Sequence, residues 1–129
     1  TPEDILPGTL RLFDCLKSSG IKIGVGSASK NALTILSQIE IEEYLDSIVD
    51  GNKVSTAKPD PEVFLIGAKE MHEKPGNCVV FEDAQSGVQA ANAGGMYSIG
   101  VGSPKILHEA NLVISGLHEM TLEKLKKLE

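Results

Sequence analysis

Apolar residues follow two patterns that alternate along the chain. One repeats at helical spacing, as in Leu12, Phe13 and Leu16. The other is a short continuous apolar run, as in residues 78–81, which is typical of a strand buried on both faces. The expected helices lie at residues 8–18, 29–39, 61–72, 85–93 and 121–128, and the expected strands at residues 21–25, 47–49, 78–81, 97–101 and 112–114.

Apolar strands separated by helices predict an α/β fold with three layers, in which helices cover both faces of a parallel sheet. Because crossovers between parallel strands are right-handed, the carboxyl ends of all strands meet at one edge of the sheet. Ligands of open α/β sheets bind at that edge. The residues that follow each strand are therefore the first candidates for a functional site.

Composition and charge argue against two classes of protein, those that bind membranes and those that bind nucleic acids. A chain of 129 residues with 41% hydrophobic and 23% charged residues is typical of one globular domain. No apolar run approaches the ~20 residues of a membrane helix, so we expect no membrane partner. Twelve basic against 18 acidic residues give a net charge of −6 without a basic stripe, so we expect no nucleic-acid partner.

Two cysteines, Cys15 and Cys78, each lie in an expected apolar element, and the chain has no Cys-x-x-Cys motif. We expect two buried, reduced thiols. A disulfide or redox pair is the alternative.

The segment after the first expected strand combines hydroxyl groups, a cation and an amide. It reads Ser27, Ala28, Ser29, Lys30 and Asn31 and opens the next expected helix. Backbone N–H groups at a helix N-terminus bind anions, so these residues predict a phosphate site. The alternative is an ordinary helix cap by one of the two serines.

A lysine and an acidic pair follow the next two strands. Lys58 lies beside prolines after the second strand and could neutralise a phosphate; the alternative is a solvated loop lysine. Glu82 and Asp83 follow the buried third strand and offer the oxygen ligands that Mg²⁺ prefers. The alternative for this pair is that one acid caps the next helix. Their order along the chain predicts one site for a phosphate and a divalent cation.

These motifs resemble those of the haloacid-dehalogenase-like (HAD) superfamily of phosphotransferases, whose core is Rossmann-like. Ser27 matches the superfamily's second motif, Lys58 the third, and residues 81–87 the acidic fourth. The stretch 27–31 is similar to the β-phosphoglucomutase branch. The resemblance covers essentially the whole chain and implies a cytoplasmic enzyme of carbohydrate metabolism.

The resemblance also implies roles for these residues. Glu82 and Asp83 would hold Mg²⁺, Ser27 and the following amide would bind the transferring phosphoryl group, and Lys58 would offset charge beside it. Lys30 and Asn31 would hold the second phosphate of a sugar phosphate substrate. The implied reaction is the conversion of β-glucose 1-phosphate to glucose 6-phosphate.

One departure from the superfamily is large. Its first motif, a strand followed by Asp-x-Asp with the nucleophilic aspartate, is absent from this chain, as is the helical cap. We therefore expect residues 1–129 to be the C-terminal portion of a HAD-like core that lacks its central first strand. On its own the chain would be inactive and would need the missing N-terminal segment as a partner.

Two other functions stay open. A phosphatase of the same superfamily would use the same site with water as the acceptor. A non-catalytic phosphate-binding module would keep the site and lack the nucleophile.

Overall fold

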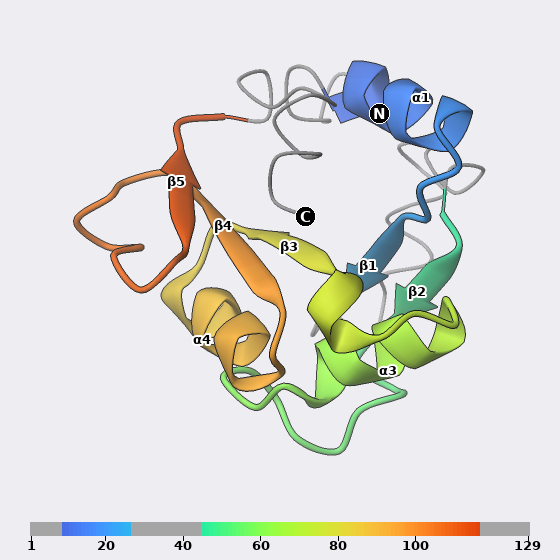
Figure 1. Cartoon of the computed structure of the whole chain (residues 1–129). Coiled ribbons are helices and arrows are strands. Elements are labelled where there is room, and N and C mark those ends of the chain that lie inside the picture. The colour runs from blue at the N-terminus through green and yellow to red at the C-terminus, as the bar shows by residue number, and fades with distance from the viewer. Residues whose placement is uncertain (1–8, 27–44, 117–129) are drawn as a thin grey trace.

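The computed structural model describes residues 9–26 and 45–116 and confirms a mixed α/β fold (Figure 1). The expected helices at 29–39 and 121–128 lie outside these residues. In chain order the elements are α1 (Thr9–Ser18), β1 (Gly24–Gly26), β2 (Ser47–Val49), α3 (Glu62–Glu70), a 3₁₀ helix (Pro75–Asn77), β3 (Val79–Glu82), α4 (Gln85–Ala93), β4 (Tyr97–Val101) and β5 (Leu112–Ile114). None of these helices has the length and apolar character that a membrane crossing requires.

All strand pairs in the described ranges are parallel, as predicted. β1 pairs with β2, with Val25 opposite Ile48. β4 lies between β3 and β5, with Val80 opposite Ser98 on one side. Within these ranges no backbone ladder joins β1 to β3. The expected central strand between them stays a prediction.

Apolar side chains are buried on both faces of β3, which explains its continuous apolar sequence. Val80 packs in a cluster with Ala68 of α3 and Ala91 of α4. Phe81, the next residue, packs against a second cluster that includes Leu16 of α1. Because successive side chains of a strand point to opposite faces, α3 and α4 cover one face of β3, and Leu16 of α1 packs on the other side. The three layers predicted from the sequence are therefore present (Figure 1).

β1 begins later than the apolar run at 21–25 predicts. The backbone N–H of Ile23 donates to the Asp46 carboxylate at 2.7 Å, and the Asp46 N–H donates to the Ile23 carbonyl at 2.6 Å. The side chain of Asp46 thus takes the donor that a regular ladder would use. Strand pairing starts only at Gly24.

α3 ends earlier than its sequence pattern predicts, at Glu70 instead of near residue 72. His72 has a φ of 58°, in the left-handed region that stops an α-helix. The Glu73 N–H then donates to the Ala68 carbonyl at 2.9 Å. Lys22 completes this helix end by donating to the Met71 carbonyl at 2.6 Å.

Both cysteines are free thiols, as expected, but the expected burial of Cys15 is wrong, because its side chain is exposed. On α1 it is Leu16 that enters the core, and a neighbouring position lies about 100° around the helix. Cys78 is partly buried, and this burial raises the pKa of its thiol, with a smaller contribution from Glu73. A thiol held in its neutral form is a poor nucleophile.

Candidate functional site

The carboxyl ends of β1 and β3 meet at Lys58, which belongs to the loop after β2. Its Nζ lies 2.9 Å from Oε2 of Glu82 at the end of β3. The same Nζ lies 3.4 Å from the carbonyl oxygen of Gly26 at the end of β1. The predicted convergence at one edge of the sheet therefore holds for Lys58 and Glu82.

Lys58 is held by its surroundings. Its side chain is 18% exposed, and its ammonium group lies 4.9 Å from the centre of the Phe64 ring on α3. The Lys58–Pro59 peptide bond is cis. An ion pair and a cation–π contact, both partly shielded from water, keep the ammonium group in one place. The alternative of a solvated loop lysine is wrong.

Glu82 uses both carboxylate oxygens. Oε2 accepts from Lys58, and Oε1 accepts from the backbone N–H of Ala84 at 3.2 Å, the residue that precedes α4. The side chain is only 11% exposed. A carboxylate this far from water is costly without partners, and Lys58 and Ala84 are its two partners. The neighbouring Asp83 is exposed.

Gly87, in the first turn of α4, provides the space that Glu82 occupies. A Cβ atom at this position would lie 2.0 Å from both Cγ and Cδ of Glu82, closer than any real contact. Only glycine therefore lets the Glu82 side chain cross the start of α4 and reach Lys58. The acidic motif of the sequence includes Gly87, but the motif alone assigns it no role. The available signal is a glycine inside a helix, where it costs about 1 kcal/mol relative to alanine.

The loop that carries Lys58 is tied to the first residue of α3, Glu62. The Glu62 carboxylate accepts from the backbone N–H of Ser55 and, at 2.9 Å, from its hydroxyl group. These bonds lower the pKa of Glu62 below its usual value. Asp60, which precedes the N-cap residue Pro61, accepts the Glu62 N–H at 3.0 Å.

The donor set at the end of β3 fits a magnesium ion. Mg²⁺ commonly takes one or two protein carboxylates and completes its shell with water and substrate phosphate. Glu82 and Asp83 are two such carboxylates in sequence, although Glu82 also binds Lys58. Residues 9–26 and 45–116 contain no group of three or more His, Cys, Asp or Glu that could hold an ion. The magnesium site stays a prediction.

The predicted phosphate-binding residues, Ser27, Ala28, Ser29, Lys30 and Asn31, lie outside the described residues. Their place in the chain is still informative, because Ser27 directly follows Gly26. The Gly26 carbonyl lies within 3.4 Å of the Lys58 ammonium group. Gly26, the residue that precedes this segment in the chain, therefore lies beside Lys58.

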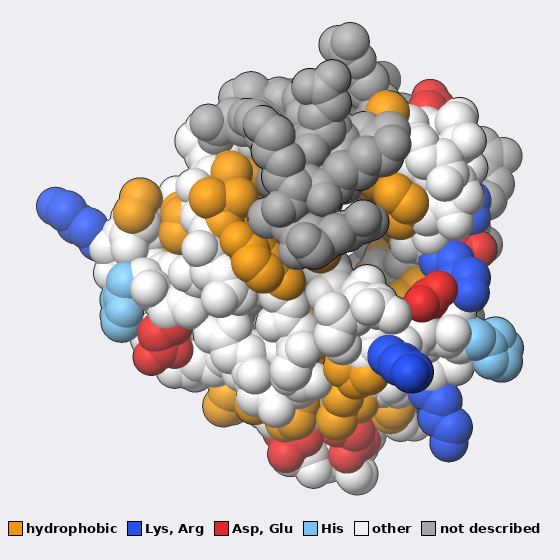
Figure 2. Space-filling view, in the orientation of Figure 1, with side chains coloured by type: hydrophobic (Ala, Val, Ile, Leu, Met, Phe, Trp, Pro, Cys, Tyr) orange, Lys and Arg blue, Asp and Glu red, His pale blue; other side chains and the backbone are white. Residues whose placement is uncertain are grey.

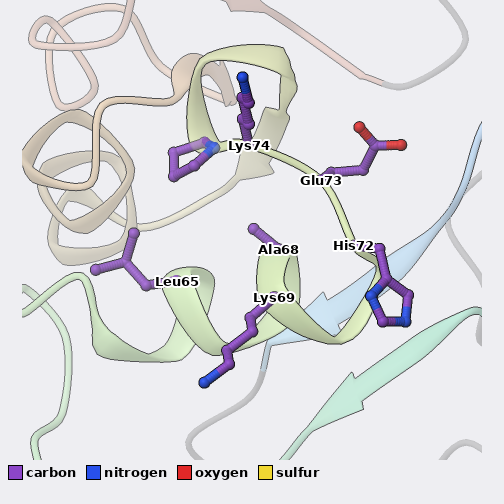
Figure 3. A pocket seen from close by; sticks show the side chains of 7 residues that line it. Leu65, Ala68, Lys69, His72, Glu73 and Lys74 are labelled. Atoms are coloured by element: carbon purple, nitrogen blue, oxygen red, sulfur yellow. The ribbon is translucent and has the colours of Figure 1, made fainter.

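A separate hollow of about 520 Å³ lies at the carboxyl end of α3. It is lined by Leu65, Ala68, Lys69, His72, Glu73, Lys74 and Pro75 (Figure 3). The side chains of Lys69 and Lys74 point in different directions, so they do not converge on one ligand. On the face drawn in Figure 2, most of the described Lys and Arg side chains lie at the right of the view, near acidic and His side chains, and another lies at the far left.

Comparisons with known proteins give a matching family model and similar sequences. A family model described as haloacid dehalogenase-like hydrolase matches residues 1–95. The β-phosphoglucomutase of Bacillus subtilis is 41% identical over 125 residues, which are 97% of this chain and 55% of that protein. A phosphorylated carbohydrates phosphatase of Thermotoga maritima is 33% identical over 129 residues, 95% of this chain and 60% of that protein.

A solved structure has the same fold. The crystal structure of β-phosphoglucomutase from Clostridium difficile superposes with a TM-score of 0.95 at 41% identity, over 99% of this chain and 57% of that one. This chain thus spans between 55% and 60% of the length of these relatives.

Proposed function

Because the chain belongs to the haloacid dehalogenase-like hydrolase family, we propose that it supplies the lysine and metal ligands of an enzyme that transfers phosphoryl groups on sugar phosphates. In the complete protein the reaction is the conversion of β-glucose 1-phosphate to glucose 6-phosphate, in the cytoplasm. The observation that carries the proposal is the Lys58–Glu82 ion pair, which lies where the ends of β1 and β3 meet.

Lys58 is the residue that offsets negative charge. Phosphoryl transfer brings a carboxylate nucleophile and a phosphoryl group together, and catalysis rests mainly on neutralising and positioning these charges. The Lys58 ammonium group is already oriented by Glu82 and Phe64 before substrate binds. Because its side chain is only 18% exposed, its charge acts in a medium less polar than water.

Asp83 and Glu82 are the residues that would hold Mg²⁺. When bound, the ion supplies a Lewis acid for the phosphoryl oxygens. Glu82 would then serve the lysine and the metal together, and the exposed Asp83 would be the freer ligand.

Ser27 to Asn31 complete the proposed substrate site. The Ser27 hydroxyl and the amide of Ala28 bind the transferring phosphoryl group. Ser29 belongs to the same proposed phosphate site, and Lys30 and Asn31 hold the second phosphate of the sugar. A site for a second phosphate is what a mutase needs and a simple phosphatase does not.

A phosphatase is the second candidate, and the similarity to the phosphorylated carbohydrates phosphatase of Thermotoga maritima supports it. The same site would act with water as the acceptor. Free phosphate is then the product to measure, together with the product of isomerisation.

The test compares this 129-residue chain with a longer polypeptide that also contains the residues encoded upstream of it. Both are incubated with β-glucose 1-phosphate and Mg²⁺, and glucose 6-phosphate and free phosphate are measured. We expect glucose 6-phosphate only from the longer protein, and none from its Lys58→Met variant. Phosphate without glucose 6-phosphate would select the phosphatase, and an upstream region without Asp-x-Asp and without turnover would select a binding module.

A further inference from the structure

The loop that carries Lys58 is closed at its base by a single acidic side chain. Both oxygens of the Glu62 carboxylate contact Ser55: Oε1 accepts from the backbone N–H and Oε2 accepts from the hydroxyl group. A third contact joins Oε1 to the same hydroxyl at 3.2 Å. These contacts therefore close residues 55–62 into a ring, and Lys58 is one of the residues of that ring.

α3 holds this ring from two positions. Glu62, its first residue, ties the base of the ring, and Phe64, two residues later, lies under the Lys58 ammonium group at 4.9 Å. The Glu62 carboxylate accepts from Ser55 and from the backbone N–H of Thr56, both in the loop. The Glu62 side chain is thus committed to the loop.

We infer that Glu62 is a positioning residue for Lys58: by closing the ring at Ser55, it keeps the lysine in contact with Glu82. Without the Glu62 carboxylate the ring opens, and the Lys58 ammonium group leaves Glu82 for solvent more often. The catalytic consequence rests on the proposed function. The effect on Lys58 itself does not.

The test reacts the folded 129-residue chain with an acylating reagent. Mass spectrometry of its peptides then measures how fast the Lys58 amine is acylated. An amine in a partly buried ion pair reacts slowly, and it reacts faster when its loop opens. In Glu62→Ala we expect the acylation rate of Lys58 to rise about threefold or more. Lys53, which donates to the Ile48 carbonyl and Glu70 outside the ring, should keep its rate.

Two further variants keep the test decisive. Ser55→Ala removes only the hydroxyl contact, so Lys58 acylation should rise less than in Glu62→Ala. Adding Ser55→Ala to Glu62→Ala should change nothing more, because the contact is already lost. Glu109→Gln, which removes one exposed charge from another loop, is the matched control and should leave Lys58 unchanged.

Three results would overturn the inference. Unchanged Lys58 reactivity in both Glu62→Ala and Ser55→Ala would show that the ring does not hold the lysine. Equal increases at Lys58 and Lys53 would show general loosening, and an equal rise in Glu109→Gln would show a charge effect. None of these readouts needs turnover, so a failure here is separate from a failure of the proposed reaction.

Discussion

Gly87 is the residue on which the observed site geometry depends most. A Cβ atom on residue 87 would lie 2.0 Å from the Glu82 side chain, which already fills this space. In Gly87→Ala we expect Glu82 to swing away from Lys58, because the two groups cannot share the space. The free energy of unfolding should fall by about 1–3 kcal/mol, because a partly buried ion pair is broken. Chemical denaturation measures the loss, and Lys58 acylation reports the broken ion pair.

Gly76 offers a matched control. It lies in the 3₁₀ helix, and no atom lies within 4 Å of the position that a Cβ would take there. Gly76→Ala should change stability by less than about 0.5 kcal/mol. Equal effects of the two substitutions would mean that the space above Gly87 is not what places Glu82.

Asp46 makes stability depend on pH. Its pKa is lowered by the hydrogen bond from Lys17, an effect that the Ile23 N–H reinforces and burial partly opposes. A lowered pKa in the folded state stabilises the protein above the unfolded value near 3.8, and this contribution is lost as the pH falls through the folded pKa.

Asp46→Asn removes this contribution. Relative to the wild type, the variant should be less stable at pH 7, and the difference should shrink as the pH is lowered from about 5 to about 2. Urea denaturation across this range gives the two curves. A constant difference at every pH would contradict the role of the Asp46 charge.

At the scale of elements, the end of α3 carries strain that a glycine would relieve. His72 adopts a φ of 58°, which is unfavourable for residues with a Cβ. His72→Gly should raise the free energy of unfolding by about 0.5–1 kcal/mol, measured by thermal or urea denaturation. His72→Ala is the control, since it also removes the imidazole but keeps the Cβ. A gain in the alanine variant as large as in the glycine variant would mean that backbone strain is not the cause.

The elements that the sequence predicted best are those defined by local pattern. β2, α4, β4 and β5 have the predicted bounds, because apolar runs and the glycines after α4 mark their ends. β1 and α3 differ from the prediction because contacts distant in the chain set their limits. Asp46 takes the Ile23 N–H, and Lys22 joins the carboxyl end of α3. Apolar periodicity contains no information about either contact.

At the scale of the whole molecule, the parallel topology was enough to predict that Lys58 and Glu82 meet at one edge of the sheet. The topology could not show which charged groups the Glu82 carboxylate contacts. Glu82 binds Lys58 as well as lying next to Asp83, and the space for it comes from Gly87 on the following helix. Such contacts between side chains depend on packing, which a residue pattern does not specify.

The central claim is that Lys58, Glu82 and Asp83 serve one site for phosphate and magnesium. The most direct measurement is a calorimetric titration of the 129-residue chain with inorganic phosphate, with and without Mg²⁺. We expect binding that requires Mg²⁺ and weakens by about tenfold or more in Lys58→Met and in Asp83→Asn, because each variant removes a charge-assisted contact. Phosphate affinity that is the same in wild type and both variants, or that does not depend on Mg²⁺, would contradict the account.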